Sequence, residues 1–277
     1  MVVSRRSAIL NVMVDAAEKA GRALVRDFGE VEHLQVSKKG PADFVSTADL
    51  KSEKILMETL SKGRPSYGFL MEEGGEKKGT ESNMRWIIDP LDGTTNFLHG
   101  IPHWCVSIGL EKDGDIVAGV VHNPINDETF YSEKGTGAFM TGRRLRVSNR
   151  TTLTDSVIAM GGARPGAANH AAFMAEQDAI SPFTSGMRRF GAAALDLCYV
   201  AAARVDGFWE RDLNAWDVAA GALILKEAGG TVSEMNGGKN YVYGRSIVGA
   251  NAPLHADLLK RLQAASGKDS PKVVSAT

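Results

Sequence analysis

The feature that most limits the possible folds of this chain is a short apolar run that ends in two carboxylates. Trp86, Ile87 and Ile88 are followed by Asp89 and, three residues later, by Asp92. A short apolar run bounded by turn residues is typical of a buried β-strand. Carboxylates at the end of such a strand attract divalent cations that prefer oxygen ligands, such as Mg²⁺.

The residues after the acid pair are suited to hold a phosphate close to such a cation. Gly93 has no Cβ that would keep the backbone away from a ligand. Thr94 and Thr95 supply hydroxyl and N–H groups where a helix is expected to begin, and a helix N-terminus favours a phosphate. An isolated Asp-Pro-x-Asp-Gly run is more often a surface turn, so this interpretation depends on other acids in the chain.

Further acidic residues complete a metal site in this interpretation. Glu72 precedes Asp89 by about a strand's length. Three more acids stand at the ends of predicted elements: Asp49, Glu210 and Asp217. Each alone is typical of a helix cap or a solvated loop. Several buried like charges are unstable unless cations neutralise them, and a two-metal site needs one shared carboxylate with flanking acids.

The order of the predicted elements differs between the two halves of the chain. Helices are predicted over 4–28, 47–60, 192–204, 215–228 and from 253. Strands are predicted over 106–111, 116–121, 129–131, 138–140, 157–160, 207–210, 231–234 and 246–250. Loops or turns are predicted over 38–41, 141–144 and 161–166, and the polar stretch 75–83 is expected to be exposed. This order predicts layered α and β elements in two subdomains, 1–150 and 151–266, with a flexible tail over 267–277.

Composition excludes some classes of protein. The net charge of −1 gives no reason to expect a nucleic acid as the main ligand, and 43% hydrophobic with 23% charged residues is ordinary for a soluble globular protein. Cys105 and Cys198 lie in apolar stretches and are expected to be buried, reduced thiols. Charged residues interrupt the N-terminal segment, so we expect neither a signal peptide nor a membrane span and place the protein in the cytoplasm.

Two segments resemble the signature sequences of the inositol monophosphatase family. The first is 86–109, and the second runs from Trp216-Asp217 to Gly229-Gly230. The whole chain is similar to the family in length and order up to its tail, and within the family it most resembles the bacterial SuhB-type members. The resemblance implies an αβαβα sandwich. It also implies a Mg²⁺-dependent phosphatase that hydrolyses myo-inositol monophosphates and similar polyol phosphates.

The resemblance also implies a role for individual residues around two to three Mg²⁺ ions. One ion would be held by Glu72, Asp89 and the Leu91 carbonyl, and a second by Asp89, Asp92 and Asp217, with a weaker third ion near Glu72. The implied catalytic residues are Glu72, Thr94 and Asp49. The implied substrate contacts are Asp92, Gly93, Thr94, Thr95, Ala193, Glu210 and Asp217. Lys38 would lie in a mobile loop, and Ala192 stands where relatives often carry a hydroxyl.

The resemblance leaves the substrate and the partners open. The nearest alternatives are fructose-1,6-bisphosphatase, histidinol-phosphatase and 3′-phosphoadenosine phosphatase activities. Some SuhB-type proteins act as partners of the transcription machinery in ribosomal RNA synthesis, and the basic clusters at 143–146 and 188–189 give mild support. Homodimers and inhibition by lithium are also implied, and no membrane partner is. A zinc role for His99 and His103 is disfavoured, because Gly100 and Pro102 interrupt a helix there.

Overall fold

The computed structural model describes residues 6–30, 36–40, 43–162 and 170–266, with their side chains except those of residues 36–45. Its helices are α1 Ala8–Phe28, α2 Thr47–Gly63, α3 Thr94–Leu98, α4 His170–Ile180, α5 Ala193–Ala201, α6 Ala215–Glu227 and α7 Ala252–Ser266. None of these described helices has both the length and the hydrophobicity needed to cross a bilayer.

Two larger sheets and one hairpin contain the strands. The hairpin pairs β1 Val36–Gly40 with β2 Asp43–Ser46. The eight-stranded sheet has the order β10-β9-β8-β7-β6-β5-β3-β4. Its strands are β3 Gly68–Met71, β4 Gly75–Lys77, β5 Met84–Asp92, β6 Cys105–Lys112, β7 Asp115–Asn123, β8 Glu128–Glu133, β9 Ala138–Met140 and β10 Arg143–Arg144. The five-stranded sheet, in the order β12-β11-β13-β15-β14, contains β11 Val157–Met160, β12 Gly186–Arg188, β13 Gly207–Arg211, β14 Thr231–Ser233 and β15 Ser246–Ala250.

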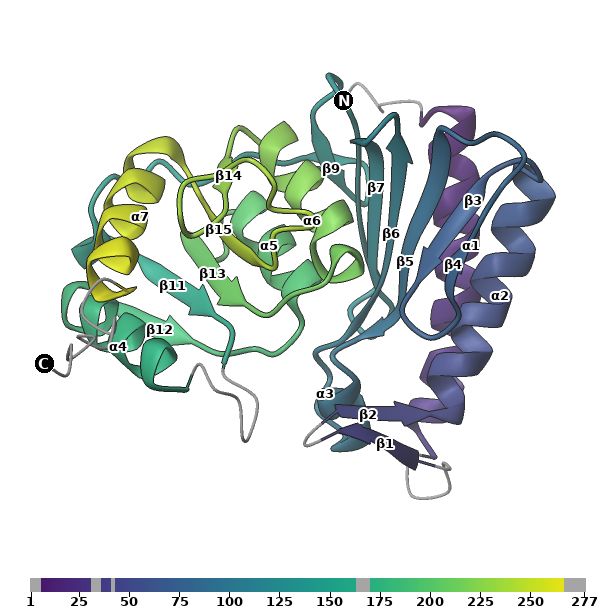
Figure 1. Ribbon diagram of the computed structural model, residues 1–277, viewed down its shortest axis with the longest axis horizontal. Helices are drawn as coiled ribbons and strands as arrows, with labels where there is room; N and C mark the ends of the chain where they lie inside the picture. The colour runs from purple at the N-terminus through teal and green to yellow at the C-terminus, as the bar shows by residue number, and fades with distance from the viewer. Residues whose placement is uncertain (1–5, 31–35, 41–42, 163–169, 267–277) are drawn as a thin grey trace, which may run out of the picture.

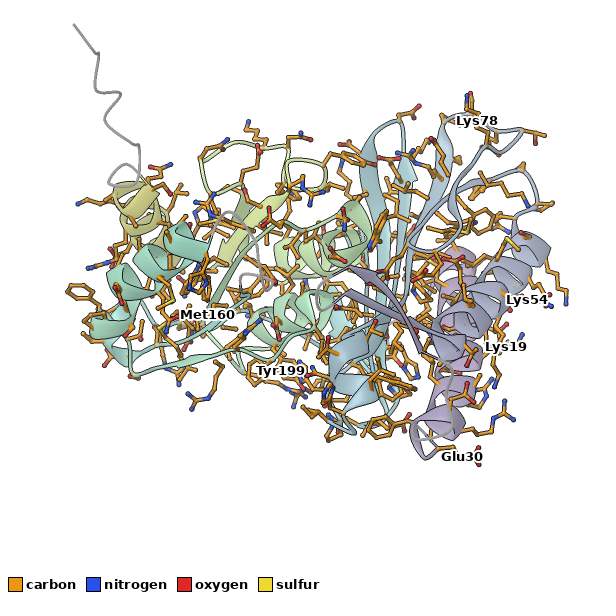
Figure 2. All side chains as sticks on the ribbon, turned by 60° about the horizontal axis from the view of Figure 1, so that its bottom comes forward. Lys19, Glu30, Lys54, Lys78, Met160 and Tyr199 are labelled. Atoms are coloured by element: carbon orange, nitrogen blue, oxygen red, sulfur yellow. The ribbon has the colours of Figure 1, made fainter. Side chains whose placement is uncertain are left out.

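These elements stack in five layers, which confirms the predicted αβαβα sandwich (Figure 1). Helices α1 and α2 cover the outer face of the eight-stranded sheet, and α4 and α7 cover the outer face of the five-stranded sheet. Helices α5 and α6 lie between the two sheets. The two outer helices α1 and α2 bury only one face, and Lys19 and Lys54 point away from the sheet into solvent (Figure 2).

The composition of α6 explains its central position. Its sequence is apolar on almost every side, and a helix that is hydrophobic all round is buried. It packs on β5 to β8 with one face and on β14 and β15 with another. A Cβ at Gly119 would lie 2.9 Å from the Ala220 carbonyl oxygen, so glycine allows the sheet to approach the helix backbone closely. The C-terminal part of the chain is therefore packed directly against the N-terminal sheet.

Several predicted elements are confirmed, and others are wrong. The strands 138–140, 157–160 and 246–250 have the predicted bounds. The loop predicted over 38–41 is wrong for residues 38–40, which form part of β1 because they pair with β2. Residues 143–144 of the predicted turn pair with β9 as β10. Helix α4 and the strands β2, β4 and β12 were not predicted. Residues 163–166 of the glycine-rich loop and the tail 267–277 lie outside the described residues, and the division into two subdomains stays a prediction.

Candidate active site

The acid pair lies at an irregularity of β5. Asp89 pairs with Ser107 and Asp92 with Cys105, and the register shifts between these two pairs because Pro90 and Leu91 form a bulge. Proline cannot donate to a strand ladder, so it is tolerated where the ladder is interrupted. The side chains of Asp89 and Asp92 are nevertheless buried, with 2% and 9% of their surfaces exposed. The bulge therefore brings two carboxylates to one place in the protein interior.

Main-chain N–H groups hold one oxygen of each of three carboxylates. The Leu91 N–H donates to Asp89 Oδ1 at 2.9 Å, and the Ala194 N–H donates to Asp92 Oδ2 at 2.8 Å. The Asn214 N–H, at the beginning of α6, donates to Asp217 Oδ2 at 2.6 Å. Such bonds stabilise the ionised acid and fix its orientation.

Glu72 reaches the same edge through the sheet topology. Strand β3 runs parallel to β5, with Met71 opposite Ile88. Parallel strands bring their carboxyl ends to one edge of a sheet, so Glu72 and Asp89 each follow a paired residue there. The predicted association of these two acids is consistent with the electrostatics, because the charge of Glu72 raises the pKa of Asp89.

Mutual repulsion and burial disfavour ionisation of this cluster. The pKa of Asp89 is raised well above its ordinary value, first by burial and then by the charges of Glu72, Asp92 and Asp217. The pKa of Asp92 is also raised well above its ordinary value, chiefly by burial and by Asp217, although the Ala194 N–H opposes this. A nearby cation would relieve both effects.

Asp49 and Thr94 form a second buried unit beside the bulge. Asp49 is the third residue of a capping box that begins α2, and its Oδ2 accepts from the N–H and Oγ of Ser46 at 2.9 and 2.6 Å. The Thr94 hydroxyl lies 3.2 Å from Asp49 Oδ1 and 3.1 Å from the Leu91 carbonyl oxygen. Either acceptor can take its single proton, which leaves the lone pairs of Thr94 Oγ1 available to accept.

Gly93 allows the chain to turn from β5 into α3. Its φ of +92° lies in the left-handed region, and a Cβ there would lie 3.1 Å from the His103 carbonyl oxygen and 3.3 Å from Ala192 Cβ. Helix α3 begins at Thr94, as predicted, and Thr95 is exposed in its first turn. The predicted phosphate-binding residues therefore stand directly after the acid pair.

The remaining predicted substrate contacts come from the C-terminal half. Glu210 lies near the end of β13, and its pKa is raised well above its ordinary value by burial and then by Asp196, Asp217 and Asp92. Ala193 is the first residue of α5 and is buried. Lys38 was predicted to lie in a mobile loop but belongs to β1, and its side chain lies outside the described residues.

Sequence reasoning missed three contributors to this site. The Ala194 N–H, on the first turn of α5, holds Asp92, and the Cys105 thiol lies 3.7 Å from the same Asp92 oxygen. Asp196 is buried among the apolar residues of α5. A lone acid in an otherwise apolar helix was the available signal for Asp196, whereas a main-chain donor leaves no trace in residue identity.

The donor set fits Mg²⁺ chemically. Carboxylate and carbonyl oxygens are the ligands that hard cations prefer over thiolate or imidazole. Across the residues that the structure describes, no three His, Cys, Asp or Glu side chains are gathered into a ready-made metal-binding group. The cluster therefore has the donor chemistry of a magnesium site.

Known proteins resemble this chain over almost its full length. The inositol monophosphatase family matches residues 5–267. Inositol-1-monophosphatase of Mesorhizobium japonicum is 57% identical over 93% of this chain and 97% of that protein. Nus factor SuhB of Escherichia coli K12 is 40% identical over 88% of this chain and 91% of that protein.

A solved structure shares the fold as well as the sequence. The crystal structure of the extragenic suppressor protein SuhB from Bartonella henselae superposes with a TM-score of 0.91 at 55% identity. The match covers 93% of this chain and 99% of that one. The family match includes the acid-bearing strand β5 and the helix α6. The chain is therefore an enzyme of the inositol monophosphatase family.

Proposed function

We propose that this enzyme is a Mg²⁺-dependent phosphomonoesterase that hydrolyses myo-inositol monophosphates and similar polyol phosphates to the polyol and phosphate. The observation that carries the proposal is the buried acid cluster of Asp89, Asp92 and Asp217, each held by a main-chain N–H, beside the Thr94–Asp49 pair. The name of the 57% identical relative supports inositol monophosphates as the substrate class.

Each acid of the cluster has a place in holding two to three Mg²⁺ ions. The residues that would hold them are Glu72, Asp89, Asp92, Asp217 and, through its carbonyl oxygen, Leu91. When bound, the ions supply positive charge that lowers the pKa of a water and neutralises the phosphate. The raised pKa values of Asp89 and Asp92 support this assignment, because ionised carboxylates so close together need such compensation.

Thr94 is suited to orient the attacking water. Because its own proton points to Asp49 or to the Leu91 carbonyl, Thr94 Oγ1 can accept a hydrogen bond from that water. Glu72 would take the other proton of that water. Thr95 and the N–H groups that follow Gly93 would contact the phosphate, and Glu210 would accept hydrogen bonds from polyol hydroxyls. Direct in-line attack then releases phosphate without a phospho-enzyme.

A panel of phosphate esters tests the reaction and the substrate. We expect the highest kcat/KM for myo-inositol monophosphates, activity only with Mg²⁺, and heavy oxygen from labelled water in the released phosphate. A clear preference for fructose 1,6-bisphosphate, histidinol phosphate or a nucleotide 3′-phosphate would change the assignment within the family. A covalent acyl-phosphate on the enzyme would contradict direct attack.

A second function is favoured by the relatives named Nus factor SuhB. Those names suggest a partner in the transcription machinery, which we expect to bind a surface and not the acid cluster. Arg143 and Arg144 on β10 and Arg188 and Arg189 near β12 are exposed basic candidates. Asp89→Asn separates the two functions, because it should abolish hydrolysis and leave partner binding intact. A variant that loses both would show that they share one site.

The remaining expectations concern the assembly and its surroundings. We propose a homodimer in the cytoplasm, inhibited by Li⁺ through competition at the weaker metal position. Sedimentation velocity gives the oligomeric state directly. Inhibition by Li⁺ that is relieved by added Mg²⁺ would support the competition.

A further inference from the structure

A cluster of side chains that takes no part in the proposed chemistry joins the two halves of the site. It consists of Asn96, His103, Phe190, Asp196 and Tyr199. Asn96 and His103 belong to the segment between β5 and β6, whereas the other three lie on or just before α5. Tyr199 marks the position of this cluster in Figure 2. We call it the α3–α5 cluster.

Contacts of three kinds hold the α3–α5 cluster together. His103 Nε2 lies 3.3 Å from Asp196 Oδ1. The His103 ring stacks on Phe190 with centroids 5.0 Å apart and meets Tyr199 edge-on at 5.4 Å. The amide nitrogen of Asn96 donates to the carbonyl oxygens of His103 and Phe190, both at 2.7 Å. The imidazole is thus fixed in orientation by two rings and by its own backbone.

Asp196 is the unusual member of the cluster. Only 1% of its side chain is exposed, and it stands in the first turn of an apolar helix. Within the described part of the chain, neither carboxylate oxygen has a well-aligned hydrogen bond, and His103 Nε2 is the basic group that faces it. Burial raises the pKa of Asp196 to about 6, and the neighbouring His103 opposes this rise. A buried carboxylate is costly, so its presence here calls for a role.

The position of Asp196 in α5 suggests that role. Asp196 follows Ala194 by two residues in the first turn of α5, and the Ala194 N–H donates to Asp92 Oδ2 at 2.8 Å. Any shift or rotation of this turn would move the Ala194 N–H away from Asp92. His103 belongs to the segment that carries Thr94 and Thr95. An attraction between His103 and Asp196 would therefore oppose movement of the two parts of the site away from each other.

We propose that His103 and Asp196 are a positioning pair that keeps the first turn of α5 in place, so that the Ala194 N–H holds Asp92 in the orientation that binds Mg²⁺. The inference rests on the proposed function, since it gives Asp92 a metal to bind. Neither residue touches the substrate in this role. Groups that orient a metal ligand from outside typically change metal affinity by about 10- to 100-fold when they are removed.

The decisive variants remove the contact between His103 and Asp196 and keep the size of the side chains. His103→Phe retains a ring for stacking on Phe190 and Tyr199, and Asp196→Asn retains the volume of the acid. His103→Gln keeps an N–H that can donate to Asp196 and is the conservative rescue. Two controls change a buried residue of the same type elsewhere in the C-terminal half: His255→Phe, which loses a contact with Ser233, and Asp206→Asn, which loses an ion pair with Arg150.

Two measurements that do not depend on turnover report the effect. One is the hydrogen exchange of the Ala194 amide by NMR, and the other is the dissociation constant of Mg²⁺ by calorimetry. In His103→Phe we expect faster exchange of that amide and affinity weakened by roughly 10- to 100-fold. The loss of Mg²⁺ affinity in the double variant His103→Phe/Asp196→Asn should be smaller than the product of the losses in the two single variants, because the two residues act together. In His103→Gln and in both controls, the Mg²⁺ dissociation constant and the exchange rate of the Ala194 amide should stay within about threefold of the parent values.

The outcomes separate this inference from the proposed function. If Asp92→Asn binds Mg²⁺ as tightly as the parent enzyme, the proposed metal site is wrong. If Asp92→Asn loses Mg²⁺ while folded His103→Phe and Asp196→Asn keep both the parent affinity and the parent exchange of Ala194, only the positioning pair is refuted. Should His103→Phe fail to fold, Asp196→Asn decides alone, since it changes no volume.

Discussion

Helices α2 and α6 come from opposite halves of the chain and begin with the same local structure. Each has an aspartate as its third residue, Asp49 in α2 and Asp217 in α6, and each aspartate accepts the N–H of its N-cap residue. Asp49 is fully buried, and both of its oxygens are bonded, to Ser46 and to Thr94. Asp217 is only partly buried, and its charge acts on Asp89 and Asp92.

The difference shows that the surroundings, and not the capping box, decide what such an acid does. A carboxylate whose oxygens are all satisfied by protein donors can orient a neighbour but has little left for a cation. A carboxylate that faces other carboxylates needs a cation to be stable. We therefore expect Asp49 to act through Thr94 and Asp217 to act on the metal.

The largest expected effect is a difference in Mg²⁺ binding between variants of Asp217 and Asp49. Asp217→Asn should weaken Mg²⁺ binding severely and lower kcat/KM by roughly a thousandfold, about 4 kcal/mol of transition-state stabilisation. Asp49→Asn should leave the Mg²⁺ dissociation constant within about threefold, because the hydrogen bonds of Asp49 go to Ser46 and Thr94 and orient none of the assigned metal ligands. Calorimetry and steady-state kinetics give both quantities. An equal loss of Mg²⁺ affinity in the two variants would contradict the different roles assigned to Asp49 and Asp217.

The next effect tests whether Asp49 works through the Thr94 hydroxyl. Asp49→Asn and Thr94→Val should each lower kcat by about a hundredfold with little change in KM, since positioning of a proton donor or acceptor contributes on this scale. The kcat of the double variant should lie within about threefold of the kcat of the slower single variant. Fully multiplicative losses would mean that the two residues act independently.

Stability toward acid can be compared between the two halves through one buried histidine in each. His122, on β7, is 5% exposed, and burial lowers its pKa from 6.5 to about 4. The unfolded chain takes up a proton near pH 6.5 and the folded chain only near pH 4, so stability falls as the pH drops through this interval. The loss should reach about 2 kcal/mol by pH 5.

Urea unfolding at pH 7 and pH 5 measures this loss. His122→Gln should remove most of it, because the substituted side chain does not titrate. His255→Gln tests the C-terminal half in the same way, since burial also lowers the pKa of His255. A parent-like decline in His122→Gln would place the acid sensitivity elsewhere.

The smallest expected effect concerns the caps themselves. Ser46→Ala and Asn214→Ala should each lower the free energy of unfolding by about 1 kcal/mol, the usual value of an N-cap side chain. The main-chain N–H groups that hold Asp49 and Asp217 remain in both variants. Mg²⁺ affinity should therefore stay within about twofold in Asn214→Ala. A much larger loss of affinity would show that the Asn214 side chain orients Asp217.

Local signals in the sequence predicted much of the fold. Short apolar runs predicted the strands 157–160 and 246–250, and the apolar composition of 215–228 predicted the helix that forms the central layer. Helix α4 was missed because its buried residues, Glu176 and Ile180, form no apolar stripe. Strand β1 was missed because its Lys-Lys-Gly sequence is typical of a loop, and only pairing with β2 makes it a strand.

The parts of the site that depend on the identity of a side chain could be predicted from the sequence. The acid pair at Asp89 and Asp92 stands out in the sequence, and Glu72, Asp49 and Asp217 were candidates from their places at the ends of predicted elements. Their individual roles followed from the family resemblance and stay predictions. The support given by the Ala194 N–H was out of reach, because every residue but proline has such a group. The pairing of His103 with Asp196 joins residues 93 positions apart, which no local pattern reveals.

The bulge in β5 has a consequence for how this enzyme can vary. Leu91 is assigned to the metal through its carbonyl oxygen, which all twenty amino acids possess. Replacing its side chain leaves that carbonyl oxygen in place. Substitutions at Leu91 would therefore reveal only the effect of its side chain on packing. What natural selection can act on there is the shape of the backbone, and Pro90 and Gly93, which shape it, are where harmful changes should concentrate.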